Sequence, residues 1–171
     1  MFKKKRKSVS QKVKSRARRN LNSNFSPQIK TYVVDTSAII NKFPSKLIRK
    51  GMRGKIIIPN AVIAELENQA NKGREEGFKG LEEVAGFHKL KHKFPIQIHF
   101  QGLRPNEMQI KFAKSGEIDA LIREIALKNR AVLITADLVQ AKTSQAYGLE
   151  VLFLRPKARR EKKKRFLFWK K

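Results

Sequence analysis

Short apolar segments alternate with segments of helical pattern through the middle of this chain, and that alternation limits the folds open to it. We expect five strands, at residues 33–35, 55–58, 96–100, 131–135 and 151–154. Strands that alternate with helices form a parallel sheet with helices on both faces. The sequence therefore predicts an α/β fold, a three-layer sandwich whose central parallel sheet of four or five strands is flanked by helices.

Helices are expected between these strands, at residues 36–40, 61–70, 80–91, 106–114, 117–128 and 138–147. The helix at 117–128 is the most regular, since its apolar residues form one core-facing stripe. We expect Thr36 and Ser37 to cap the first helix and Asn60 to cap the second, because short polar side chains satisfy free N–H groups at helix starts.

The net charge of +26 is distributed unevenly. Residues 1–30 hold 11 Lys and Arg and no acid, residues 155–171 hold ten and one acid, and residues 31–154 hold 19 basic and 13 acidic side chains. These differences divide the chain into a basic N-terminal arm (1–30), an α/β domain (31–154) and a basic, aromatic C-terminal tail (155–171). Both ends are expected to be disordered when free and to neutralise phosphates.

The two basic ends supply the candidate nucleic-acid contacts. The C-terminal aromatics could instead dock on protein or lie on an anionic membrane surface, and the N-terminal arm could be a solvated tail. No apolar stretch is long enough to cross a bilayer, so we expect no membrane association. The candidate contacts are Lys3, Lys4, Lys5, Arg6, Lys7, Arg16, Arg18, Arg19, Arg159, Arg160, Lys162, Lys163, Lys164, Arg165 and Trp169.

Four acids stand where the expected elements begin or end. Asp35 and Asp137 end apolar runs, while Glu65 and Asp119 lie near the starts of helices. Carboxylates at the ends of parallel strands point into the crevice where such folds bind ligands. Bound Mg²⁺ or Mn²⁺ is the simplest explanation for acids gathered in so basic a chain, because these cations prefer oxygen ligands.

Such a metal site would suit the hydrolysis of a phosphodiester bond, which needs an activated water and stabilisation of charge on the phosphate oxygens. Hydroxyl side chains lie beside two of the acids. Thr36 and Ser37 follow Asp35, and Thr135 precedes Asp137 by two positions. We expect Thr36 and Ser37 to hold metal-bound waters beside Asp35, and Thr135 to support Asp137.

A simpler interpretation of the same acids remains open on spacing alone. Asp35 and Asp137 could each cap the helix that follows its strand. Asp119 lies in the first turn of its helix, where the helix dipole favours an acid in any case. Glu117 is either a residue at the rim of the pocket or a second partner of that dipole.

Four short segments also carry a resemblance to a known family. They are VVDTS at 33–37, VIAEL at 62–66, GEIDALI at 116–122 and LITAD at 133–137, in that order. Together they resemble the PIN domain, a family of metal-dependent nucleases, over about residues 31–154. The resemblance implies a PIN-like sandwich with an acidic pocket, Mg²⁺ or Mn²⁺ as cofactor and single-stranded RNA as the usual substrate.

The resemblance also assigns roles to the acids. By position, Asp35, Glu65, Asp119 and Asp137 match the family's four acids, the three aspartates holding the metal and Glu65 completing the site or positioning water. Glu65 is chosen over Glu67 because the family pattern places its acid directly before a residue equivalent to Leu66. The two glutamates lie roughly opposite each other on a helix, so both cannot easily face one pocket.

One subgroup is especially similar. Residues 59–73 look most like the PIN domains that are fused to an ATPase and a nucleic-acid-binding module. This chain contains no G-x-x-x-x-G-K-[ST] phosphate loop, so we predict no use of ATP. We expect the basic arms to take the place of the nucleic-acid-binding module.

The leading hypothesis is a metal-dependent endoribonuclease for single-stranded or structured RNA, in ribosomal RNA processing or decay. The resemblance implies products with a 5′-phosphate and a 3′-hydroxyl. The alternatives are a non-catalytic RNA-binding or ribosome-associated factor and, ranked lower, the toxin of a toxin–antitoxin pair. We expect a cytoplasmic protein. DNA remains open as a partner because phosphate-binding arms do not distinguish the sugars, and a homodimer remains open as well.

Overall fold

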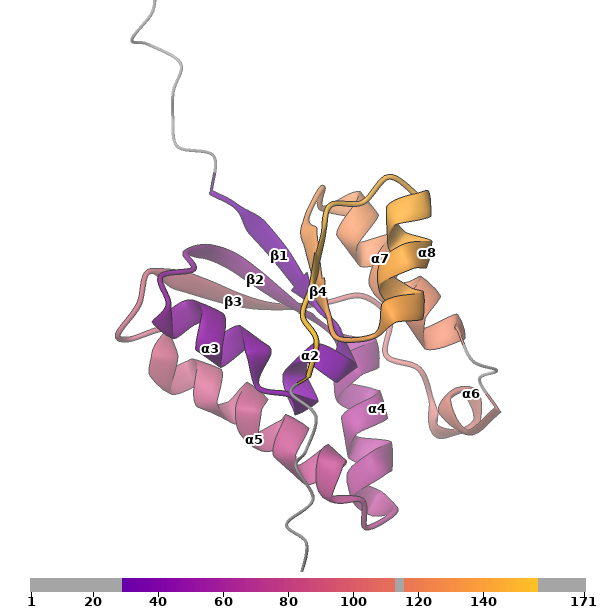
Figure 1. Ribbon diagram of the computed structural model, residues 1–171. Helices are drawn as coiled ribbons and strands as arrows, with labels where there is room; N and C mark the ends of the chain where they lie inside the picture. Colours follow the sequence, from indigo (N-terminus) through magenta and orange to yellow (C-terminus); the bar gives the residue numbers. More distant parts are fainter. Residues whose placement is uncertain (1–28, 113–115, 157–171) are drawn as a thin grey trace, which may run out of the picture.

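A computed structural model of the chain describes residues 29–112 and 116–156 (Figure 1). The candidate nucleic-acid contacts from Lys3 to Arg19 and from Arg159 to Trp169 lie outside the described residues. The sheet has five parallel strands in the order β3-β2-β1-β4-β5. The predicted α/β fold is therefore confirmed, with all five strands present. They are β1 (Thr31–Val34), β2 (Gly54–Pro59), β3 (Ile96–Gln101), β4 (Val132–Thr135) and β5 (Val151–Phe153).

The strand order reverses between β1 and β4. The chain runs from β1 outward through β2 to β3, and then returns to place β4 on the other side of β1. Val33 of β1 pairs with Ile57 of β2 and with Leu133 of β4. In open parallel sheets, the carboxyl ends of the two strands beside such a reversal form the crevice in which ligands bind.

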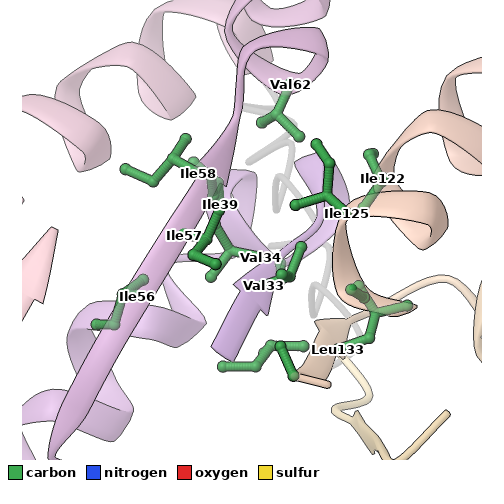
Figure 2. Packing of buried hydrophobic residues seen from close by; sticks show 14 of the residues in the cluster. Val33, Val34, Ile39, Ile56, Ile57, Ile58, Val62, Ile122, Ile125 and Leu133 are labelled. Carbon is green, nitrogen blue, oxygen red and sulfur yellow. The ribbon is translucent and has the colours of Figure 1, made fainter. Parts of the chain in front are cut away.

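Helices cover both faces of this sheet. Figure 1 shows α3 and α5 on one side and α7 and α8 on the other. Apolar side chains of the strands, such as Val33, Val34 and Ile57, are fully buried, and Figure 2 shows them in a cluster with residues of the helices, among them Ile39 of α2 and Ile125 of α7. The helices are α2 (Thr36–Ile40), α3 (Phe43–Arg49), α4 (Asn60–Asn71), α5 (Glu75–Leu90), α6 (Glu107–Phe112), α7 (Glu117–Lys128) and α8 (Leu138–Ala146).

Helix α5 begins five residues before the expected start at residue 80. The glycines at 77 and 80 lie within α5 and allow it to approach α4 closely. A Cβ on Gly77 would lie 2.6 Å from the carbonyl oxygen of Leu66, and a Cβ on Gly80 would meet the Leu66 side chain. Helix α3 was not predicted, because Pro44 interrupts the pattern. The proline lies in the first turn, where its missing N–H costs nothing.

Two expected helix caps are also wrong. Asp35, rather than Thr36 or Ser37, occupies the N-cap position of α2, and its side chain makes no capping bond. Pro59 occupies the N-cap of α4. The amide of Asn60 instead donates a hydrogen bond of 2.7 Å to the carbonyl of Gly102, which ties the start of α4 to the end of β3. No helix within the described ranges is long and apolar enough to span a membrane.

Candidate functional site

Asp35 follows β1 and is buried, with 3% of its surface exposed. Its Oδ2 accepts hydrogen bonds from Ser37 Oγ (2.5 Å) and from Thr135 Oγ1 (2.7 Å). Each hydroxyl in turn accepts a backbone N–H, Ser37 from Ala136 (2.9 Å) and Thr135 from Asp137 (3.0 Å). The two hydroxyl oxygens also lie 3.2 Å from each other. This network fixes the ends of β1 and β4 to each other.

Glu65 reaches the same region from α4. Its Oε2 accepts a hydrogen bond of 2.6 Å from Thr36 Oγ1, and its Oε1 accepts one of 3.4 Å from the side chain of Gln69. Glu67, two positions later, faces another direction and forms an ion pair with Arg104. The structure therefore places Glu65 beside Asp35 and keeps Glu67 away from it.

Asp137 lies at the junction of β4 and α8. Its Oδ1 accepts hydrogen bonds from the backbone N–H groups of Val139 (2.6 Å) and Gln140 (3.0 Å), which is the geometry of a helix N-cap. Both bonds fall on the same oxygen, and within the described ranges no hydrogen bond to Oδ2 is seen. Capping thus uses one side of this exposed carboxylate and leaves the other available for a ligand.

Asp119 lies in the first turn of α7 and is half-buried. Its pKa is raised to about 6, mainly by burial and in addition by the negative charges of Asp35, Asp137 and Glu65. The positive charge of Arg123 opposes this shift. Burial also raises the pKa of both Asp35 and Glu65. The four acids, widely spaced in the sequence, therefore share one region, in which the charges of Asp35, Glu65 and Asp137 disfavour the ionisation of Asp119.

Comparison with known proteins identifies the family. Residues 32–146 match the PIN domain. This chain belongs to the PIN domain family. The acids at the carboxyl ends of β1 and β4, together with Glu65 and Asp119, occupy the crevice of this PIN domain at the reversal of strand order.

Three relatives place this PIN domain more closely. An uncharacterised KH and PIN-domain containing protein of Methanocaldococcus jannaschii is 42% identical over 127 residues, which are 73% of this chain and 20% of that protein. The Holliday junction branch migration ATPase PINA of Sulfolobus acidocaldarius is 20% identical over 122 residues, 71% of this chain and 22% of that protein. The chain thus spans about a fifth of both relatives.

A solved structure gives the same fold. It is a domain of a functionally unknown protein from Methanocaldococcus jannaschii DSM 2661, 40% identical in sequence, with a TM-score of 0.71. The match covers 76% of this chain and 94% of the solved chain. The fold described here is therefore that of a close relative over nearly the whole of its domain.

PIN domains are in general metal-dependent nucleases, and the donor set of this one suits such a metal. Across the described residues, no group of three or more His, Asp or Glu side chains is arranged to hold a metal ion directly. Mg²⁺ keeps several of its waters and is commonly bound by only one or two carboxylates, so this arrangement does not conflict with it. The donors are all oxygen atoms, and their mutual repulsion would be relieved by a cation.

A buried glutamine that sequence reasoning missed connects two of the acid-bearing helices. Gln140 of α8 is 1% exposed, and its Nε2 donates to the backbone carbonyl of Asp119 (3.1 Å). Its Oε1 accepts a hydrogen bond from Arg123 (3.2 Å), whose guanidinium lies 4.9 Å from the ring centre of Tyr147. The spacing from Asp137 to Gln140 matches a capping box, so the sequence pointed to a helix start rather than to this link.

Among the predicted site residues that the structure describes, Glu117 is the one that lies apart from the acid cluster. It is exposed in the first turn of α7 and makes no hydrogen bond or ion pair with any other described residue. An acid at this position stabilises the positive end of the helix dipole. This stabilisation explains the presence of Glu117, and no role in the acid cluster is needed.

Proposed function

We propose that this PIN domain is a Mg²⁺- or Mn²⁺-dependent endoribonuclease that cuts single-stranded or structured RNA. The observation that supports the proposal is the convergence of Asp35, Glu65, Asp119 and Asp137 at the reversal of strand order, with a pKa near 6 for Asp119. A cluster of acids that resist ionisation beside one another is costly in a folded protein. An activity that depends on a bound cation would explain why the acids are kept together despite this cost.

The roles of the side chains follow from their contacts. Asp35, Asp119 and Asp137 would hold the cation, which when bound would supply an acidic water and positive charge for the phosphate oxygens. Ser37 and Thr135 hold the carboxylate of Asp35 in one orientation, so that this ligand is already in place before a cation arrives.

Glu65 has a separate role in this proposal. Thr36 holds one of its oxygens, and its pKa is raised by burial, so it is suited to accept a hydrogen bond from the attacking water. The water oxygen would bond to phosphorus as the bond from phosphorus to the 3′ oxygen breaks. The products would carry a 5′-phosphate and a 3′-hydroxyl.

RNA is the substrate that the composition and one relative support. The chain carries a net charge of +26, most of it at its two ends, and phosphate neutralisation is the main source of nucleic-acid affinity. The most similar curated relative reported above combines KH and PIN domains, and KH is an RNA-binding module. We propose that the basic arms bring RNA to the acids of this PIN domain.

Cleavage of labelled single-stranded RNA tests the proposal. Wild type is assayed with Mg²⁺ or Mn²⁺ and with EDTA, beside Asp119→Asn and the matched control Glu124→Gln, an exposed acid on the same helix. All three proteins are purified identically, because so basic a protein carries contaminating nucleases. We expect wild type and Glu124→Gln to cut only with metal, and Asp119→Asn to lose at least about a hundredfold in rate.

Two results would refute the proposal. One is equal cleavage by wild type and Asp119→Asn, which would assign the activity to a contaminant. The other is tight RNA binding with no cleavage under any metal, which would favour a non-catalytic RNA-binding protein. Repeating the assay with DNA of the same sequence decides which sugar the site accepts.

A further inference from the structure

A hollow of about 800 Å³ lies at the amino-terminal ends of the strands, whereas the acids lie at the carboxyl ends. We call it the basal groove. Its apolar wall includes Tyr32, Met52 and Phe94, and its lining also includes the cations Lys30, Arg53 and Lys91. An apolar surface bordered by positive charge suits a ligand that has flat apolar parts and negative groups.

Backbone hydrogen bonds tie the segments around the groove to one another. The N–H of Lys55 donates to the carbonyl of Lys30 (3.0 Å), and the N–H of Gly54 donates to the carbonyl of Pro95 (3.2 Å). Gly54 has a φ of +117°, and a Cβ at this position would collide with the Lys30 carbonyl oxygen. The starts of β1, β2 and β3 are therefore fixed to each other, and the groove exists before any ligand binds.

The charge around the groove is positive except for Glu150, which pairs with Lys30. Residues 36–64 and 84–106 contain no Asp or Glu, and within them residues 42–55 hold six Lys and Arg and residues 89–93 hold three. These short segments adjoin the ends of α3 and α5 and the starts of β2 and β3. The acids of the domain thus lie away from this edge of the sheet, apart from Glu150.

Several of these cations have local roles that do not need a ligand. Arg49 and Lys89 lie in the last turns of their helices, where the dipole favours positive charge. Lys46 donates to the carbonyl of Asn41. Lys30 forms an exposed ion pair of 3.5 Å with Glu150, which contributes little to stability.

Two of the other cations line the groove itself. Arg53 and Lys91 are exposed, line the groove, and form no ion pair with any residue in the described part of the chain. Lys91 is the C-cap residue of α5, where the helix dipole favours a cation, whereas Arg53 follows α3 and lies outside any helix. The position of Arg53 beside an apolar wall is therefore not explained by stabilisation of the fold.

We propose that the basal groove binds a segment of single-stranded nucleic acid. Arg53, Lys91 and Lys30 would contact phosphates, and unpaired bases would pack on the rings of Tyr32 and Phe94. Bases supply flat apolar faces and the backbone supplies regular negative charge, so a single strand satisfies both features of the groove. An acidic peptide would satisfy only the charge.

The position of the N-terminal arm supports this occupant. Ile29, the first described residue, lines the groove, and the 28 residues before it contain ten Lys and Arg and no acid. A strand in the groove would therefore lie beside the point at which this arm joins the domain. The preference for nucleic acid over an acidic peptide rests in part on the proposed function, since one strand could then contact both edges of the sheet.

Salt dependence of binding tests the groove in the full chain. The double variant Arg53→Gln/Lys91→Gln is compared with Lys72→Gln/Lys142→Gln, which removes the same charge from exposed positions elsewhere. The probe is a labelled oligouridine of about 12 nucleotides, as RNA and as the deoxy equivalent, in EDTA. Each lost phosphate contact lowers the slope of log K against log salt by about 0.7, so we expect the groove variant to lower it by about 1.4.

The control variant should leave the slope within error of wild type. Equal slope changes in the two variants would show a general effect of charge and overturn the proposal, as would an unchanged slope in the groove variant. Since binding is measured in EDTA, the result does not depend on cleavage. The groove can therefore fail while the nuclease proposal stands, and the reverse also holds.

Crosslinking gives a local readout that the basic arms cannot produce. Oligouridine with a photoreactive thiouridine is irradiated on the full chain, and the adducts are located by mass spectrometry. We expect adducts on Tyr32 or Phe94 in wild type. In Arg53→Gln/Lys91→Gln the yield of these adducts should fall at least about threefold, because the groove is occupied less often. Adducts confined to the arms or to the region of the acids would overturn the proposal.

Discussion

Replacement of Asp119 by asparagine should stabilise the metal-free protein, although it should abolish cleavage. The pKa of Asp119 is about 6 in the folded protein, against an ordinary value of 3.8. A difference of about 2 pH units corresponds to about 3 kcal/mol of unfavourable free energy when the group is ionised. Because the side chain is only half-buried, screening by solvent reduces this, and we expect a gain of about 1–1.5 kcal/mol.

The sign of the pH dependence follows from the raised pKa. Below about pH 4, Asp119 is protonated in both the folded and the unfolded chain, and it costs no stability. As the pH rises from 3.8 to about 6, the unfolded chain loses this proton more readily, so the folded state of wild type is progressively penalised. Asparagine does not titrate, so the advantage of the variant should be complete above about pH 7 and smaller near pH 5.

Thermal unfolding in EDTA at about pH 8 measures this advantage, with Glu124→Gln as the control. For a domain of this size, about 1–1.5 kcal/mol corresponds to a rise of roughly 3–7 °C in Tm. Mn²⁺ at ten times its Kd should then raise the Tm of wild type by a comparable amount, since it adds about 1.4 kcal/mol, and should raise that of the variant less. A Tm for Asp119→Asn at or below that of Glu124→Gln would refute the idea that the acids repel one another here.

Three further predictions concern the packing and the site. Gly77→Ala should destabilise the fold by about 1–3 kcal/mol in urea unfolding, because the new Cβ would crowd the backbone of α4. In the control Gly86→Ala, in the same helix, the Cβ meets nothing within 4 Å, so this change should stabilise the fold by about 0.5–1 kcal/mol. Similar effects of the two changes would argue against close packing of α4 and α5. Gln140→Met should weaken Mn²⁺ binding several-fold in calorimetry, since the link to the Asp119 carbonyl is lost, and unchanged affinity would assign Gln140 to packing alone. Mn²⁺ affinity of wild type should fall up to about tenfold for each pH unit below 6, because the cation competes with the proton on Asp119, and a flat profile would exclude Asp119 as a ligand.

The strands could be predicted because their signal is local. Four of them are short apolar runs between turn or helix signals, as burial between two layers of helices requires. The fifth, β3, alternates apolar and polar residues, which is the pattern of a strand with one polar face. The starts of α3 and α5 could not be predicted in the same way. Gly77 breaks a helical pattern in isolation, and its reason for being there is the backbone of α4, which only the folded chain brings close. No helix was predicted around Pro44, which lies in the first turn of α3.

The acids show a different limit. A helix cap and a metal ligand need the same residue at the same position after a strand, so spacing could not separate the two for Asp35 and Asp137. The structure separates them through the direction of the hydrogen bonds. Asp137 caps α8 with one oxygen, whereas Asp35 makes no cap and is held by Ser37 and Thr135. The sequence placed Ser37 beside Asp35 correctly, but it assigned Thr135 to Asp137, whereas the hydroxyl of Thr135 donates to Asp35.

The hydrogen bonds within the acid cluster explain why Asp119 should respond most strongly to a cation. Asp35 is bonded to hydroxyls, Glu65 to Thr36 and Asp137 to the start of α8. Asp119 has no side-chain hydrogen bond to any described residue, so nothing offsets its burial except the charge of Arg123. Asp119 is also the acid whose pKa is raised by the charges of all three others. A bound cation would remove that repulsion, and the stability of the domain should then depend on the metal most directly through Asp119.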